Sequence, residues 1–471
     1  MIYTSFANMP HRQLWSAILR LAAPLILSMT GLMLMHLVDA LFLSWFSADA
    51  VAAVVPSSMA AYLLLSPFVG TVGYGSTLVA HYVGSGNVSR AYAAIWQSIY
   101  LAVAAGLLIL PVGFLSDTLY DIVGHDPAVR LLEAQYFRLM CWGSVTALLG
   151  SAVSGYFSGK GATRTLMFVQ LFAFACNAVL DYLLIFGKLG LPRMGVSGAA
   201  LATILAQLIN ALILLVIFLA DDGRSGRPWR DRAFEWPLTR RLIRFGFPNG
   251  VRFGFEMLAW TMFLFFIGRL GRIELAASSI VFRVNGLSFF PIVGLGHAVA
   301  ILVGQSQGRR DPASSIRLTR TGLRMAQIWM FMAALIYLLF PRQILIMFAG
   351  GQAPDAEFDQ VVRIGAILLR FVAAYSLVDA YNIIHTSALQ AAGDTRWTMM
   401  VAVVANGAFL GALMLAEHLG CGLWWNWLLA TAFVMTTALI WHTRFRRGRW
   451  KEIRVIEPLL PDEYVRKLTS S

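Results

Sequence analysis

The stretch DDGRSGRPWRDRAFEWPLTRR, residues 221–241, is the one long polar segment near the middle of an otherwise apolar chain. Of the 471 residues, 58% are hydrophobic and only 13% are charged, whereas a soluble domain carries about a quarter charged residues. On both sides of this stretch the apolar residues fall in blocks of roughly 20–28, long enough to cross a hydrocarbon core about 30 Å thick. We therefore predict an all-α membrane protein with the polar stretch as its central linker.

Six apolar segments precede this linker and six follow it. We expect the twelve spans at approximately 15–45, 51–80, 93–115, 131–156, 163–186, 195–220, 240–268, 275–303, 318–340, 360–388, 396–417 and 422–443. The first, second, seventh, eighth and tenth are long, so we expect them to be tilted or kinked. The predicted division is an N-terminal six-helix bundle over residues 1–222, a cytoplasmic linker over 223–238, a C-terminal six-helix bundle over 239–447 and a cytoplasmic tail over 448–471.

The two halves repeat each other in sequence. Sliding the chain against itself tests this, and matched prolines and glycines are more informative here than matched apolar residues. An offset of 224 residues pairs Pro24 with Pro248, Pro67 with Pro291 and Gly84 with Gly308, and an offset of 232 pairs Arg138 with Arg370 and Gly161 with Gly393. Halves of six spans each enter the membrane in the same orientation, so we predict two pseudo-symmetric bundles with a transport path between them.

The net charge of +13 is concentrated in short loops and in the C-terminal tail, with no aromatic residues interleaved for base stacking. This pattern argues against nucleic acid as a partner. One set of loops, which includes Lys160, Arg224–Arg244, Arg309 and Arg396, carries more than twice as many basic residues as the opposite set. By the positive-inside rule the basic set is cytoplasmic. We therefore predict a multi-pass protein of the bacterial inner membrane with both termini in the cytoplasm.

Four carboxylates lie well inside the apolar spans: Asp39, Asp181, Glu256 and Asp379. An ionisable group in a span costs about 2.5–3.5 kcal/mol on insertion scales and usually has a function. None of the four has an acid at the repeat-related position. Duplication alone does not explain them, and each half has its own set of candidate residues.

In the N-terminal half, Asn177 and Asp181 are four residues apart and share one helix face. With Asp39 and Thr203 they can hold a proton in a hydrogen-bonded network, or a small hard cation such as Na⁺. The alternative is that Asn177 and Asp181 only join helices by interhelical hydrogen bonds. His36 shares a face with Asp39, where it can either tune that carboxylate or make a helix contact.

In the C-terminal half, Tyr375 lies one turn before Asp379, which places an aromatic face beside the carboxylate. Together with Glu256, this arrangement suits Na⁺ or an organic cation. Arg252 lies four residues before Glu256, and an intrahelical ion pair between the two is the competing interpretation.

Pro24 and Pro248 occupy equivalent interior positions in the first span of each half. Proline removes a backbone hydrogen bond and kinks a helix. Because Pro24 precedes Asp39 in the same span, we expect bending of this span to be coupled to protonation of Asp39.

The chain resembles the multidrug and toxic compound extrusion (MATE) family, most closely its NorM-type bacterial branch, over nearly its whole length. The resemblance is carried by GLMLMHLVDALFLSWFSADAVAA, NAVLDYLLIFGKLGLPRMGVSGAALAT, FFPIVGLGHAVAILVGQSQG and SALQAAGDTRW, in this order and at the corresponding spans. The residues that match family positions are Asp39, Asn177, Asp181 and Thr203 in the N-terminal half and Glu256, Tyr375 and Asp379 in the C-terminal half. His36, His81 and the nearby Arg252 depart from the usual pattern.

This resemblance implies a V-shaped pair of bundles that exports lipophilic organic cations in exchange for inward Na⁺ or H⁺. It implies no cofactor and no enzymatic activity, drugs and membrane lipids as partners, and a monomer. Na⁺ would bind at Glu256 and Asp379, or at Asp39, Asn177 and Asp181.

Two other classes of protein fit the sequence less well. A lipid-linked oligosaccharide flippase of the same superfamily would need a basic central cavity for anionic head groups, whereas the charges buried here are mainly acidic. An intramembrane enzyme would need a nucleophile–base set or metal ligands, and the sequence has no His/Asp cluster with metal-ligand spacing.

Overall fold

The computed structural model describes residues 6–123, 126–224, 232–347 and 356–457, and these ranges are helices joined by short connections. The N-terminal half contains α1 (His11–Phe46), α2 (Ala48–Gly73), α3 (Gly75–Gly84), α4 (Val88–Phe114), α5 (Ser116–Val123), α6 (Pro127–Trp142), α7 (Ser144–Lys160), α8 (Thr163–Phe186) and α9 (Val196–Arg224). The C-terminal half contains α10 (Trp236–Leu270), α11 (Arg272–Gly308), α12 (Pro312–Leu339), α13 (Pro341–Ile346), α14 (Ala356–Ala391), α15 (Thr395–His418) and α16 (Leu423–Arg447), followed by the 3-10 helix η2 (Arg449–Glu452).

Eleven helical stretches among the described residues are long and apolar enough to cross a membrane, with α2 and α3 counted as one stretch, Ala48–Gly84. The fourth predicted span, 131–156, is instead divided into α6 and α7 at Gly143. A Cβ on Gly143 would lie 2.3 Å from Cγ1 of Ile204 on α9, so the missing side chain lets α9 approach the backbone at the break. The two short helices together form the twelfth span.

The duplication is visible in the order of the helices. In each half a long first helix is followed by a second span, a third span, a short helix and three further spans, so that the short helices α5 and α13 correspond. The breaks do not correspond, because α11 and α14 are continuous where the N-terminal half is interrupted at Tyr74 and Gly143. At the offset of 232 residues, Gly143 corresponds to Tyr375 of the C-terminal half.

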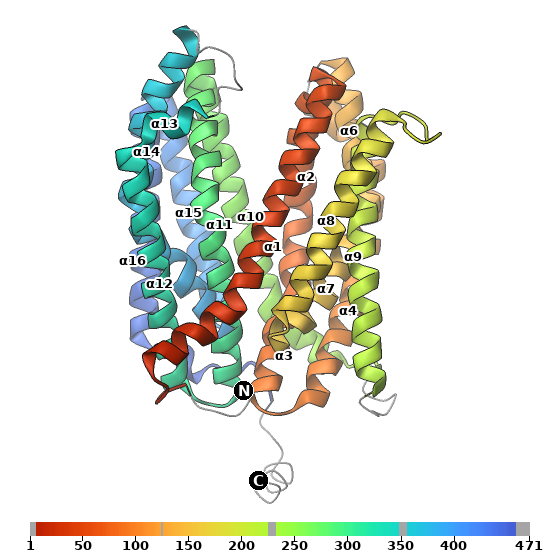
Figure 1. Cartoon of the computed structure of the whole chain (residues 1–471), viewed down its shortest axis with the longest axis vertical. Helices are drawn as coiled ribbons and strands as arrows, with labels where there is room; N and C mark the ends of the chain where they lie inside the picture. Colours follow the sequence, from red (N-terminus) through yellow and green to blue (C-terminus); the bar gives the residue numbers. More distant parts are fainter. Residues whose placement is uncertain (1–5, 124–125, 225–231, 348–355, 458–471) are drawn as a thin grey trace, which may run out of the picture.

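The two halves lie together at the end of the molecule that carries both termini and diverge toward the opposite end (Figure 1). Helices α2 and α3 of one half pack here against α10 and α11 of the other. The backbones almost touch: a Cβ on Gly70 would lie 2.3 Å from Cα of Gly250, and a Cβ on Gly84 would lie 2.0 Å from the carbonyl oxygen of Gln305. Glycine allows this close approach because it has no side chain.

The buried apolar side chains are arranged like the helices, joined across the halves at one end and separate at the other. One cluster of buried side chains takes residues from both halves, such as Leu78 and Val83 together with Leu302 and Ile384. A second cluster, around Phe263, belongs to the C-terminal half alone, and a third belongs to the N-terminal half alone. The core is therefore continuous across the halves at the terminus end and separates into two cores at the divergent end.

Candidate functional site

The N-terminal acids are held by α1 and α8, which pack against each other. Asp181 and Asn177 are fully buried on one face of α8, and the side chain of Asp39 on α1 is 18% exposed. The carboxyl groups of Asp39 and Asp181 lie close enough to interact electrostatically. Two carboxylates near each other repel, and one proton on the pair removes that repulsion. The structure thus brings Asp39 and Asp181 together across two helices.

These groups have few partners. Among the described residues, no hydrogen-bond partner is found for either carboxyl oxygen of Asp181, for Oδ1 of Asp39, or for the amide nitrogen and oxygen of Asn177. A buried polar atom without a partner costs about 1–3 kcal/mol, and a charged one costs more. A proton or a small cation between the carboxyls would remove most of this cost. The arrangement is therefore suited to binding one or the other.

Two further side chains, Tyr136 and His36, lie near this pair. Tyr136 on α6 is buried and close enough to interact electrostatically with both carboxylates. Sequence analysis missed it, because a tyrosine in an apolar span is usually a packing residue. Nδ1 of His36 lies 3.9 Å from Oδ2 of Asp39, so the two share a face as predicted. Thr203 donates its hydroxyl to the Ala199 carbonyl at 3.0 Å, a bond within α9.

In the C-terminal half, Arg252 and Glu256 form an ion pair on α10. The Glu256 side chain is 35% exposed and that of Arg252 is 13% exposed. With its side-chain amide turned to satisfy its neighbours, Gln390 accepts a hydrogen bond from Nη2 of Arg252 at 3.1 Å. The intrahelical ion pair, which was the competing interpretation of the sequence, is therefore present. It neutralises the Glu256 charge in this conformation.

Asp379 lies on α14 near this ion pair. Its Oδ1 accepts a hydrogen bond from Nδ2 of Asn382 at 3.1 Å, and the same nitrogen donates to the Val434 carbonyl at 3.0 Å. Asp379 lies within electrostatic range of Glu256 and of the buried Tyr375. Asn382 was missed at the sequence level, although its position three residues after Asp379 places it on the same helix face.

Pro24 and Pro248 are both buried and both lie inside continuous helices, α1 and α10. Figure 1 shows α1 bent, with its N-terminal part crossing the lower part of the C-terminal half. Among the described residues there is no group of three or more His, Cys, Asp or Glu side chains able to hold a metal ion.

Duplicated six-span halves, each with its own acids inside the spans, define a multi-pass membrane protein of two repeated bundles. The MatE family matches this chain twice, over residues 24–183 and again over 248–414. The two matches begin 224 residues apart, which is the offset of the internal repeat. The chain therefore belongs to the MatE family of multidrug and toxic compound extrusion proteins, and it is of the NorM type.

Among its relatives, a probable multidrug resistance protein NorM of Bradyrhizobium diazoefficiens is 29% identical, with 91% of this chain and 92% of that protein aligned. The multidrug resistance protein NorM of Burkholderia vietnamiensis is 27% identical over 86% of this chain and 89% of that protein. Among solved structures, the outward-facing conformation of a multidrug resistance MATE family transporter superposes with a TM-score of 0.82 at 20% identity, covering 93% of this chain and 97% of that one. At this identity the likeness supports the fold.

Proposed function

We propose that this protein is a secondary active multidrug efflux antiporter, which exports lipophilic organic cations in exchange for Na⁺ or H⁺. The observation that carries the proposal is the Asp39–Asp181 carboxyl pair with Asn177 inside the spans, most of whose oxygens have no hydrogen-bond partner among the described residues. Relatives named as multidrug resistance proteins support the class of substrate.

An aromatic contact between α1 and α8, close in sequence to the two acids, favours an organic cation. Phe42 lies one turn after Asp39, and its ring centroid is 6.0 Å from that of Tyr182, the residue next to Asp181. The Tyr182 side chain is 46% exposed. A ring face near a carboxylate attracts a lipophilic cation by both charge and the ring quadrupole. The same carboxylates can bind a driving ion, so drug and ion compete for them.

Competition of this kind produces exchange if each bound state favours a different arrangement of the two halves. An inward cation crossing about 100 mV releases roughly 2.3 kcal/mol, which can drive export against a gradient. With both termini in the cytoplasm, the divergent end in this structure faces outward. The Asp39–Asp181 pair then lies toward the outward end of α1 and α8, where an entering ion displaces the drug.

In the C-terminal half we propose Asp379 as the stronger candidate for binding an ion or a drug. Glu256 is already paired with Arg252, and Asp379 has a neutral amide partner, Asn382. Tyr375 adds an aromatic face. Glu256 acts in this scheme only when Arg252 moves away.

The moving bodies are the bundles over residues 1–222 and 239–447, with 223–238 as linker and 448–471 as tail. Residues 225–231 of the linker and 458–471 of the tail lie outside the described residues. We place the protein in the bacterial inner membrane as a monomer among lipids, with Pro24 and Pro248 as bending points of α1 and α10.

Ethidium efflux from proteoliposomes tests the proposal. The purified protein is reconstituted, and efflux is followed under an imposed Na⁺ gradient, an imposed proton gradient, or neither. We expect one gradient to accelerate efflux several-fold. If neither gradient accelerates efflux in wild-type protein that is correctly folded and inserted, exchange driven by either ion is ruled out.

A further inference from the structure

The segment that follows α16 packs against the terminus end of the molecule. Gly448 ends α16 in a left-handed conformation with φ 75°, which turns the chain into η2. Trp450 is buried, stacks on Phe445 with ring centroids 5.0 Å apart, and donates Nε1 to the Phe445 carbonyl at 2.9 Å. Val455 is also buried, and a Cβ on Gly393 would lie 2.4 Å from its Cγ2. Residues 449–457, here called the strap, are therefore fixed by apolar contacts.

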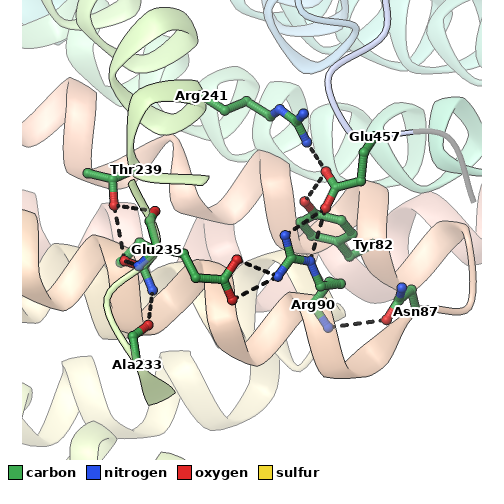
Figure 2. Close-up of polar contacts among 9 residues, drawn as sticks. Tyr82, Asn87, Arg90, Ala233, Glu235, Thr239, Arg241 and Glu457 are labelled. Carbon is green, nitrogen blue, oxygen red and sulfur yellow. Dashed lines mark hydrogen bonds and ion pairs between the residues drawn. The ribbon is translucent and has the colours of Figure 1, made fainter. Parts of the chain in front are cut away.

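The strap ends in a charge network centred on Glu457 (Figure 2). Oε1 of Glu457 accepts hydrogen bonds from Nε and Nη2 of Arg90 at 3.0 and 2.8 Å. Oε2 accepts from the Tyr82 hydroxyl at 2.8 Å and forms an ion pair with Arg241. Arg90 also donates Nη1 to both carboxyl oxygens of Glu235, at 2.9 and 2.7 Å. Two arginines and two glutamates thus balance each other.

The members of this network come from three parts of the chain. Tyr82 and Arg90 belong to α3 and α4 of the N-terminal half, and Arg241 belongs to α10 of the C-terminal half. Glu457 comes from the strap and contacts all three residues. One carboxylate therefore joins the two halves at the end where they lie together. Without it, Arg90 and Arg241 would face each other with one fewer negative charge, and like charges at short range repel.

We propose that the strap stabilises the conformation closed at the terminus end, with Glu457 as its fastening residue. The inference rests on the proposed function, since alternating access requires this end to open at some stage. Opening separates α3 and α4 from α10, so Glu457 cannot keep its bonds to Arg90 and Arg241 together. The strength of the Glu457 contacts then sets the fraction of molecules that are open at the terminus end.

Glu457→Gln tests the strap, with Glu452→Gln as matched control. Glu452 is an exposed acid of the same segment, and among the described residues no ion pair is found for it. The probe is Ala80→Cys in a background with the three native cysteines replaced by serine. Ala80 is buried, and a Cβ on Gly304 of the other half would lie 2.9 Å from its Cβ. A polar maleimide should therefore reach this position only when the terminus end opens.

We expect Glu457→Gln to raise the labelling rate in lipid nanodiscs about fivefold, which corresponds to about 1 kcal/mol. Glu452→Gln should leave the rate unchanged. Tyr82→Phe removes one hydrogen bond and no charge, so it should give a smaller increase and serves if Glu457→Gln folds poorly. Labelling at the wild-type rate in both Glu457→Gln and Tyr82→Phe overturns the proposal, as does an equal increase in Glu452→Gln.

A distance measurement gives an independent test. Spin labels at Arg164→Cys and Arg396→Cys occupy exposed, repeat-related positions in the first turns of α8 and α15. Glu457→Gln should increase the population with the longer distance, and an unchanged distribution argues against the strap. Neither measurement uses a drug or an ion gradient. Failure of the strap and failure of the efflux proposal are therefore distinguishable.

Discussion

In the proposed mechanism, single residues decide how each half binds a cation. In the N-terminal half most of the carboxyl oxygens of Asp39 and Asp181 have no donor among the described residues, and in the C-terminal half one acid has an arginine partner and the other an amide. The first pair gains most from a proton or an ion, because burial of a charge without a partner is costly. The second pair is already partly satisfied by the protein.

Asp39→Asn should lower ethidium efflux by on the order of tenfold or more, a barrier change of about 1.4 kcal/mol or more. An asparagine amide donates permanently to Asp181, so the site behaves as though protonated and no longer exchanges an ion. Folding should be retained, since the change removes a poorly partnered charge. Efflux and thermal unfolding are measured together, with Asp49→Asn as control because Asp49 is an exposed acid at the start of α2. Wild-type efflux in Asp39→Asn would exclude this carboxylate from coupling.

Asp379→Asn should reduce ion-stimulated efflux more than Glu256→Gln does. Arg252 already neutralises Glu256, whereas Asp379 has only a neutral hydrogen-bond donor from a side chain. We expect the ion concentration that gives half-maximal efflux to rise several-fold in Asp379→Asn and to rise less in Glu256→Gln. The reverse order would identify Glu256 as the principal acid of this half.

Helix spacing made part of these sites predictable. The Arg252–Glu256 pair and the shared face of Asn177 and Asp181 follow from a separation of four residues. The approach of Asp39 to Asp181 and the position of Tyr136 do not, because they depend on how α1, α6 and α8 are rotated against one another. A single sequence contains no information of that kind unless homologous sequences are compared.

At the scale of the helices, hydropathy located the spans but not their interruptions. The segment 131–156 is apolar throughout, so nothing in its composition separates α6 from α7. The break at Gly143 follows from a tertiary contact, the close approach of Ile204. Sequence patterns of this kind give span positions reliably and helix continuity poorly, because continuity is decided by neighbouring helices.

Pro24→Ala should slow efflux several-fold without destabilising the protein. An interior proline costs a helix about 3 kcal/mol relative to alanine, so the substitution favours a straight α1. If bending of α1 accompanies ion binding at Asp39, a stiffer helix slows the cycle while thermal stability stays equal or rises. Pro111→Ala is the control, since Pro111 is exposed near the end of α4. Efflux at the wild-type rate in Pro24→Ala would separate bending from coupling.

At the scale of the whole molecule, the duplication predicted two halves but not the conformation they adopt. Two arrangements of the same bundles differ by only a few kcal/mol, so no local sequence pattern selects one. In this structure the contacts at the terminus end favour one arrangement, because the apolar core there continues from one half into the other. Glycines at these contacts replace side chains that would hold the halves apart.

Gly250→Ala should shift the protein away from the conformation closed at the terminus end. Its Cβ would lie 2.2 Å from the Pro67 carbonyl oxygen, which belongs to the backbone of the other half and cannot move aside as a side chain can. Overpacking of this kind costs about 1–3 kcal/mol, enough to change the ratio of two conformations by about 5-fold to about 150-fold. Maleimide labelling at Ala80→Cys should rise and ethidium efflux should fall. Gly411→Ala is the matched control, because its Cβ would meet nothing within 4 Å and alanine favours the helix. Equal behaviour of the two variants would mean that the close contact at Gly250 does not set the conformation.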